Sequence, residues 1–172
     1  ANFAENATGT VLDVNATSEG VITFSISGGV DAAQFAIDSA TGVLTFVASP
    51  DFETPTDSGA NNVYDVQVTA STASSGTAVQ NVAITVTAVN DNDPVITTAS
   101  TVNFAENATG TVIDVNATDV DLPAQMMTFA ITGGADAAKF AINATTGIVT
   151  FVATPNFEAP TDAGADNVYN LQ

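Results

Sequence analysis

Residues 2–17 read NFAENATGTVLDVNAT and residues 103–118 read NFAENATGTVIDVNAT, so the two stretches differ only at Leu12 and Ile113. A near-identical segment that returns after about 101 residues indicates a tandem structural repeat. A period of this length matches one ordinary globular domain. The chain is therefore expected to hold two copies of one domain.

The second copy follows the first with four residues inserted near residues 120–124, after which Phe24 pairs with Phe129 and Tyr64 with Tyr169. Gln172 pairs with Gln67, so the second copy has no counterpart of residues 68–90. We therefore expect an incomplete second domain, as in a piece of a longer array.

The charge balance limits the functions open to this chain. Nineteen acidic residues face a single basic residue, Lys139, which gives a formal net charge of −18. Nucleic-acid binding needs lysine and arginine to displace counterions, so it is excluded as a function. Dense negative charge serves either as a solubilising surface or as a set of ligands for cations. The positions of the acids must decide between these two roles.

The chain contains no cysteine and no histidine, which removes thiol nucleophiles, imidazole bases and the usual zinc ligands. Any metal must therefore be bound by oxygen atoms, and Ca²⁺ is the hard cation that accepts large shells of carboxylates and carbonyls. The sequence also has no run of eighteen apolar residues, so no membrane insertion is expected in this segment.

Apolar and polar residues alternate with period two in short runs bounded by glycine, asparagine, aspartate and serine, which is typical of strands. Tyr64, Val66 and Val68 fall on one face of such a run and Asp65 and Gln67 on the other, as expected for one buried and one solvated face. The first copy predicts strands at 10–14, 22–26, 35–37, 43–47, 63–70 and 79–89, with an edge strand near Phe3. This is the strand content of a seven-stranded, all-β sandwich.

The segment 89–94 reads VNDNDP, a short charged stretch that ends in proline and has no apolar residue beyond Val89. It is expected to link a first domain over 1–88 to a second over 95–172. Asp57 and Asp162 each follow Pro-Thr, and we expect their side chains to bond nearby backbone in turns.

Four short motifs, in this order along the chain, resemble those of cadherin repeats. They are Phe3-Ala4-Glu5-Asn6, Asp51-Phe52-Glu53, the segment 89–94 and Asp119-Val120-Asp121. The overall sequence pattern is similar to that of the cadherin-like repeats of large bacterial surface adhesins. The resemblance implies tandem seven-stranded Greek-key sandwiches of the immunoglobulin-like, cadherin type, the second lacking most of its last two strands.

The resemblance also implies a calcium site at the joint between the repeats, holding up to three ions. The ligands that it implies are Glu5, Asp51, Glu53, Asn90, Asp91, Asn92, Asp119 and Asp121. One departure weakens this match, because Ala88 stands where the family's linker usually has an aspartate. In the second copy Asn156 takes the place of Asp51, and without a following linker Glu106 and Glu158 are expected to form only half a site.

We therefore expect an extracellular, calcium-binding spacer in a cell-surface adhesin or filament, with the neighbouring repeats of the same chain as its partners. A homophilic or cell-surface partner is a further expectation. The alternatives are a module that binds polysaccharide or protein, and a filament subunit completed by a strand from another chain. An enzyme is disfavoured, because paired carboxylates such as Asp51 and Glu53 at a domain joint have no cleft or aromatic subsites to serve hydrolysis.

Overall fold

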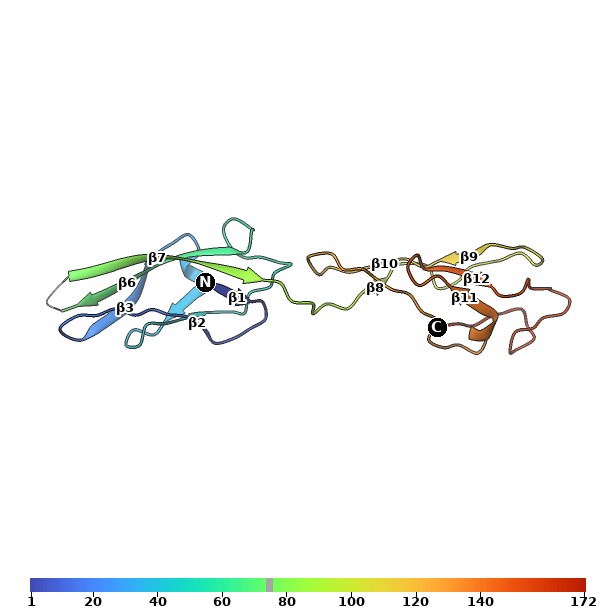
Figure 1. Cartoon of the computed structure of the whole chain (residues 1–172), viewed down its shortest axis with the longest axis horizontal. Coiled ribbons are helices and arrows are strands. Elements are labelled where there is room, and N and C mark those ends of the chain that lie inside the picture. Colours follow the sequence, from blue (N-terminus) through green and yellow to red (C-terminus); the bar gives the residue numbers. More distant parts are fainter. Residues whose placement is uncertain (74–75) are drawn as a thin grey trace. The chain divides into compact units, whose positions relative to one another are not determined.

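The computed structural model describes residues 1–73 and 76–172. The chain divides into two compact units, which are described separately (Figure 1). Unit 1 comprises Ala1–Asp91 together with Asp121–Pro123, and unit 2 comprises Asn92–Val120 and Ala124–Gln172. The short segment Asp121–Pro123 thus belongs to unit 1 although it lies within the second sequence repeat.

Unit 1 is a sandwich of a four-stranded and a three-stranded sheet. The four-stranded sheet has the order β1-β7-β6-β3, with β1 Asn2–Ala4, β7 Gly76–Thr87, β6 Val63–Thr72 and β3 Ile22–Gly28. The three-stranded sheet has the order β2-β5-β4, with β2 Thr10–Asp13, β5 Val43–Phe46 and β4 Phe35–Ile37. A one-turn 3₁₀ helix, η1 Ala32–Gln34, leads into β4. All strand pairs are antiparallel except β1–β7, which is parallel.

The core of unit 1 lies between these sheets because apolar side chains alternate along the strands. Leu44 of β5, Tyr64 of β6 and Ile84 of β7 are fully buried. The ring of Phe46 lies 4.5 Å from that of Phe35 and 5.1 Å from that of Tyr64, centroid to centroid, the second pair edge to face. Burying these side chains removes apolar surface from water and stabilises the unit.

All seven strands expected for the first repeat are confirmed, with shifts at their ends. The strand expected at 79–89 begins earlier, at Gly76, and ends earlier, at Thr87. Its end has a clear cause, since the backbone N–H of Val89 donates to the Glu5 carboxylate instead of to a neighbouring strand. The run 63–70 continues to Thr72 and pairs with β7 along its whole length (green in Figure 1).

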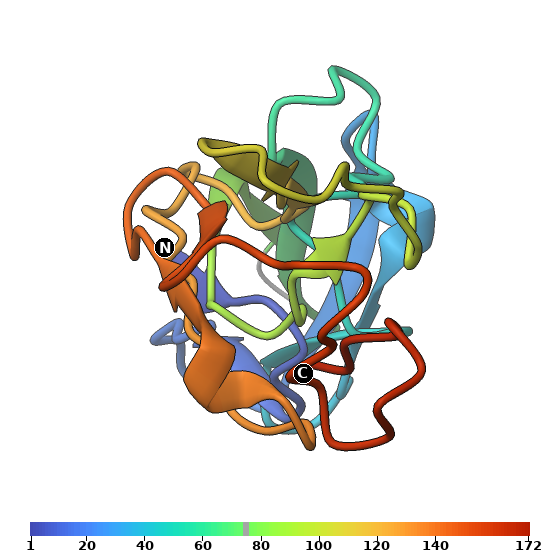
Figure 2. The same cartoon turned by 90° about the vertical axis from the view of Figure 1, so that its right-hand side faces the viewer.

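Unit 2 repeats only part of this plan. Its sheets are three-stranded, β11-β12-β9, and two-stranded, β10-β8. The strands are β8 Val95–Ile96, β9 Thr111–Asp114, β10 Ala117–Thr118, β11 Phe140–Ile142 and β12 Ile148–Phe151, with the 3₁₀ helix η2 Ala137–Lys139 before β11. Its C-terminal segment is drawn as plain coil in Figure 2.

Unit 2 has fewer strands than the sequence predicts. Residues 103–105 and 127–133, the counterparts of β1 and β3, form no strand. In unit 1, β1 pairs with β7 and β3 pairs with residues 67–72 of β6, whereas the second repeat contains residues only up to the counterpart of Gln67. The strands fail to form because the neighbours that would accept their backbone hydrogen bonds are missing.

Two buried aspartates hold the loops of unit 1. The Asp31 carboxylate accepts hydrogen bonds from the backbone N–H groups of Ser58 (2.7 Å) and Asp65 (2.8 Å). Asp57 accepts from Gly59, Asn61 and Asn62, each at 3.0 Å, so the expected turn role of Asp57 is confirmed. Asp162 plays the same turn role in unit 2, accepting from the N–H groups of residues 166 and 167.

Within residues 1–73 and 76–172, the chain forms no helix with the length and hydropathy needed to cross a membrane.

Candidate metal centre

Glu5 is a buried residue of a cluster of acidic side chains in unit 1. It directly follows β1, and its side chain is 2% exposed. One carboxylate oxygen accepts from the N–H of Val89 at 2.6 Å, and the other accepts from the N–H of Phe52 at 2.7 Å. Glu5 therefore ties the loop after β5 and the segment after β7 to the end of β1.

Asp51 and Glu53 lie on that loop, on either side of Phe52. Single carboxylate oxygens of Glu5, Asp51 and Glu53 all lie within 4.8 Å of one another. Asp51 also accepts from the N–H of Thr54 at 2.9 Å, an interaction that fixes the turn and the direction of its side chain. The three residues form the first acidic group.

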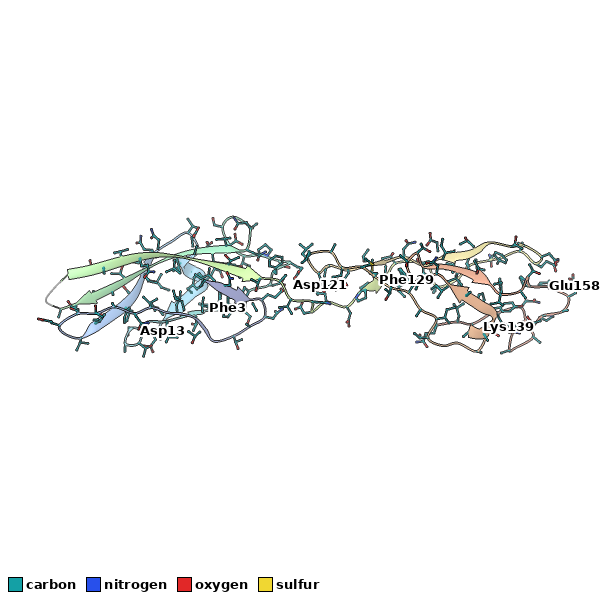
Figure 3. The ribbon with its side chains drawn as sticks, viewed as in Figure 1. Phe3, Asp13, Asp121, Phe129, Lys139 and Glu158 are labelled. Carbon is teal, nitrogen blue, oxygen red and sulfur yellow. The ribbon has the colours of Figure 1, made fainter. Side chains whose placement is uncertain are left out.

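A second acidic group shares Glu53 and adds Asp91 and Asp121, again with one oxygen from each within 4.8 Å of the others. Asp121, labelled in Figure 3, lies in the Asp121–Pro123 segment of unit 1 and is 1% exposed. The N–H of Leu122 donates to Glu53 at 3.1 Å. The side-chain amide of Asn6 donates to Asp91.

Burial and repulsion from neighbouring carboxylates oppose the ionisation of Glu53 and Asp91. Burial, followed by the nearby Glu5 charge, raises the pKa of Glu53 above its usual value. Burial also raises the pKa of Asp91, and the charges of Glu5, Asp121 and Asp51 raise it further. Like charges at this distance disfavour the ionised form. The only basic side chain of the protein, Lys139, belongs to unit 2.

The chemistry of these donors fits a hard divalent cation. Every side-chain donor in the two groups is a carboxylate oxygen, which suits Ca²⁺ and, with more retained water, Mg²⁺. The imidazole and thiolate ligands preferred by zinc and copper are missing from the whole sequence. Bound calcium would supply positive charge where the carboxylates repel one another.

Of the eight predicted ligands, the structure brings five together in unit 1: Glu5, Asp51, Glu53, Asp91 and Asp121. Asn90 also belongs to unit 1, whereas Asn92 and Asp119 belong to unit 2. A metal-binding role for all eight stays a prediction. The sequence did not single out Asn6 for its contact with Asp91, and no pattern in one sequence would have indicated it.

The sequence analysis also missed the buried Asp31 and its counterpart Asp136, which accepts from the N–H groups of Ala163 and Asn170. A signal was available, because both copies carry Asp-Ala-Ala one residue before the strand that begins at Phe35 or Phe140. These two aspartates organise loops and lie outside the acidic groups.

Unit 2 carries a weaker version of the Glu5 arrangement. Glu106 accepts from the N–H of Phe157 at 2.9 Å, as Glu5 does from Phe52, but it is exposed to solvent. Asn156, which replaces Asp51, accepts from the N–H of Glu158 at 3.0 Å. Among the residues that the structure describes, acidic groups with converging carboxylates lie only in unit 1.

Comparison with known proteins gives sequence relatives of two kinds. The chain is 39% identical over 77 residues to halomucin of Haloquadratum walsbyi, covering 44% of this chain and 1% of that protein. It is 32% identical over 153 residues to human protocadherin Fat 4, covering 85% of this chain and 3% of that protein. The chain thus spans a very small part of these relatives. No family model matches it.

The fold is matched by solved cadherin structures. The first two extracellular repeats (EC1-2) of human protocadherin-24 superpose with a TM-score of 0.71 at 20% identity, covering 93% of this chain and 76% of that chain. Extracellular cadherin domains 3–6 of protocadherin gamma B2 give a TM-score of 0.63 at 20% identity, covering 89% and 41%. The chain therefore has an all-β fold like that of tandem cadherin domains, with distant sequence similarity to parts of protocadherins and of halomucin.

Proposed function

We propose that this chain is a calcium-binding, extracellular tandem-repeat module that acts as a calcium-stiffened spacer in a cell-surface adhesin or filament. The observation that carries the proposal is the convergence of Glu5, Asp51, Glu53, Asp91 and Asp121, whose carboxylate oxygens meet in two overlapping groups. The cadherin-like fold supports it, and one matched structure is described as extracellular cadherin domains.

Calcium would act on loops that the fold already holds in part. Glu5 fixes the loop after β5 and the segment after β7 through two backbone N–H groups. A cation bound by Glu53, Asp91 and Asp121 would connect the loop after β5 to two segments that lead directly into unit 2. Asp91 directly precedes Asn92, and Asp121–Pro123 lies between Val120 and Ala124 in the sequence. With Asn90, Asn92 and Asp119 as further ligands, the linker would lose its freedom to bend.

This proposal assigns the chain a mechanical role and no reaction. Extracellular calcium modules bind with dissociation constants on the order of 0.1–1 mM, so such a site would fill only at millimolar calcium. The bacterial origin of the adhesin is part of the proposal and rests on the motifs alone.

The first test is calorimetric titration of CaCl₂ into chelator-stripped protein. We expect saturable binding, lost in a variant with Glu53→Gln, Asp91→Asn and Asp121→Asn. The matched control is Asp13→Asn, Asp65→Asn and Asp114→Asn, which removes the same charge from exposed strand residues and should bind as the parent does. If both variants lost calcium binding equally, binding would depend on net charge alone, and the proposed site would be overturned.

The second test measures stiffness. Spin labels at Asp65 and at Asp114, one on each unit, should give a broad distance distribution in EDTA and a narrow one in 5 mM CaCl₂. The same concentration of MgCl₂ should narrow it less, because Mg²⁺ demands a smaller octahedral shell. If calcium bound without narrowing the distribution of spin-label distances, the protein would bind calcium but would not be a calcium-stiffened spacer.

A further inference from the structure

Five Asn-Ala-Thr triplets in this chain fit the acceptor pattern for N-linked glycans, in which a sugar is joined to the side-chain amide of asparagine. Four of them lie in the segment that the two repeats share, and they begin at Asn6, Asn15, Asn107 and Asn116. The fifth begins at Asn143, where the first copy has the sequence Asp-Ser-Ala over residues 38–40. This triplet therefore arises from a difference between the copies.

The Asn143 triplet lies at the turn that joins β11 to β12, both labelled in Figure 1. Asn143, Ala144 and Thr145 are all exposed, whereas the alanine is half-buried in each of the other four triplets. A transferase must take the whole triplet into its own cleft, so burial of the middle residue hinders the reaction. The counterpart turn 38–40 of unit 1 is fully exposed as well, so this exposure is a property of the turn in both units.

The turn holds the Asn143 side chain through its oxygen atom and leaves its nitrogen atom available. Asn143 Oδ1 accepts from the backbone N–H groups of Thr145 at 3.0 Å and Thr146 at 3.1 Å. In the described part of the chain, no hydrogen bond uses Asn143 Nδ2 or the Thr145 hydroxyl. Both groups that define an acceptor triplet are therefore accessible without breaking a contact of the fold.

The other triplets are less accessible. Asn15 and Asn116 each donate Nδ2 to the backbone carbonyl two residues earlier in the chain, at 3.2 Å. Asn6 donates Nδ2 to Asp91 of the second acidic group, so a glycan there would lie against the candidate metal centre. The triplet at Asn107 is set apart by its half-buried alanine.

We propose that Asn143 is an acceptor for an N-linked glycan, supplied as a lipid-linked oligosaccharide and transferred by an oligosaccharyltransferase. In this transfer Nδ2 attacks C1 of the sugar, the N–C1 bond forms, and the C1–O bond to the lipid phosphate breaks. The lipid phosphate leaves with the electron pair, and Nδ2 loses one of its two protons. Oδ1 takes no part, so both hydrogen bonds of the turn persist after modification.

This inference rests on the extracellular part of the proposed function, because such transferases act on exported chains. It is independent of calcium, because Asn143 lies in unit 2 and both acidic groups lie in unit 1. The variant with Glu53→Gln, Asp91→Asn and Asp121→Asn should therefore carry the glycan as the parent does, even where it no longer binds calcium.

The test uses Lys139, labelled in Figure 3, which is the only lysine in a chain without arginine. The protease Lys-C cuts after Lys139 and separates residues 140–172, which include Asn143, from residues 1–139, which include the other four triplets. We expect protein recovered outside the cells that make it to carry glycan mass on fragment 140–172 and none on fragment 1–139. Electron-transfer dissociation, which keeps sugars attached, should place this mass on Asn143.

Variants of the triplet test the cause. Thr145→Ala should remove the glycan although Asn143 remains, because the acceptor pattern requires the hydroxyl. Thr17→Ala, which alters another of the triplets at an exposed threonine, is the matched control and should leave the glycan in place. Asp38→Asn combined with Ala40→Thr builds the triplet in the exposed turn of unit 1 and should add a second glycan, on fragment 1–139.

Several results would overturn the proposal. One is an unmodified fragment 140–172 in protein recovered outside the cells. Another is mass located on Thr145 instead of Asn143, or mass that survives Thr145→Ala. A third is the absence of a second glycan on the variant of unit 1, since an exposed turn would then not make an acceptor. A chain retained inside the cells would overturn the extracellular placement together with this inference, whereas loss of calcium binding alone would leave the inference standing.

Discussion

At the scale of single residues, Glu5 shows how one carboxylate serves both the fold and the candidate site. Its two oxygens accept backbone N–H groups from Phe52 and Val89, which belong to segments far apart in the sequence. A buried donor that loses its acceptor cannot recover the hydrogen bond it would make in water. The residue is therefore expected to stabilise unit 1 with or without a cation.

Glu5→Ala should lower the free energy of unfolding of unit 1 by about 2–3 kcal/mol, because two partly buried N–H groups lose their acceptor. Urea unfolding in EDTA and 1 M NaCl, where relief of repulsion contributes little, measures this. Tyr64 fluorescence in a Tyr169→Phe background reports unit 1.

The matched control is Glu106→Ala in the second repeat, followed through Tyr169 in a Tyr64→Phe background. Glu106 is exposed and accepts one backbone N–H, so its removal should change stability by less than about 1 kcal/mol. Equal effects at Glu5 and Glu106 would contradict the bracing role of Glu5.

Asp38 and Asn143 occupy the same turn in the two repeats and provide a pH comparison. Backbone hydrogen bonds from Thr41 and Ala40 lower the pKa of Asp38 from its usual 3.8. A lowered folded pKa contributes stability above the unfolded pKa, and this contribution is lost as pH falls through the folded value. Asn143 accepts the equivalent bonds from Thr145 and Thr146 without titrating.

Asp38→Asn should therefore be tolerated, and its effect on the stability of unit 1 should be smaller at pH 3 than at pH 6. Carboxyl ¹³C shifts give the pKa of Asp38 directly and should place it below 3.8. A titration midpoint of Asp38 above 3.8, or an equal change in stability on substitution at both pH values, would contradict the claim that the backbone hydrogen bonds of this turn lower the pKa of Asp38.

At the scale of elements, the loop after β3 passes so close to β6 that it needs glycine. Gly29 has φ +100°, and a Cβ there would lie 2.4 Å from the Asp65 carbonyl oxygen and 2.5 Å from the Val66 Cα. Gly9 has a similar φ of +104° with nothing within 4 Å of its Cβ position. Substituting alanine at each of these two glycines therefore distinguishes the cost of backbone strain from the cost of a steric clash.

Gly9→Ala should destabilise unit 1 by about 1–2 kcal/mol, the strain of a left-handed residue alone. Gly29→Ala adds a clash with backbone atoms that cannot rotate away, so its loss should be on the order of 3–5 kcal/mol. Urea titrations of both variants under the same conditions decide this, and similar losses would show that the loop moves aside.

At the scale of the whole molecule, the charge of −18 acts against compactness. With nineteen acidic residues and one base, nearly every long-range interaction between side chains is repulsive. The Debye length falls from about 10 Å at 0.1 M salt to about 3 Å at 1 M. Added salt should therefore stabilise the protein even without calcium.

Raising NaCl from 0.1 to 1 M in EDTA should raise the melting temperature by several degrees. Differential scanning calorimetry measures this shift. The charge-reduced variant Asp13→Asn, Asp65→Asn and Asp114→Asn should gain less, since it has less repulsion to screen. If the melting temperature rose equally in both proteins, the salt would be acting by strengthening the burial of apolar surface instead of by screening charge.

Much of this architecture was predictable from local pattern. Alternation located six of the seven strands of unit 1, because a strand with one buried face imposes period two on its side chains, and the edge strand near Phe3 was expected only as the seventh strand of a sandwich. The Asp and Glu motifs also marked the carboxylates that unit 1 brings together. The hydrogen bonds of Glu5 and the burial of Asp31 were not predictable, since their partners lie 27 to 84 residues away.

The sequence by itself determined the repeat, the all-β class and an oxygen-only donor set, because these follow from residue type and spacing. The tertiary structure decided whether two segments of the same sequence both become strands. Residues 2–4 and 103–105 have the same sequence, yet only the first are a strand. Asn2–Ala4 lies beside β7 and residues 103–105 have no such neighbour, because a strand exists only where another backbone accepts its hydrogen bonds.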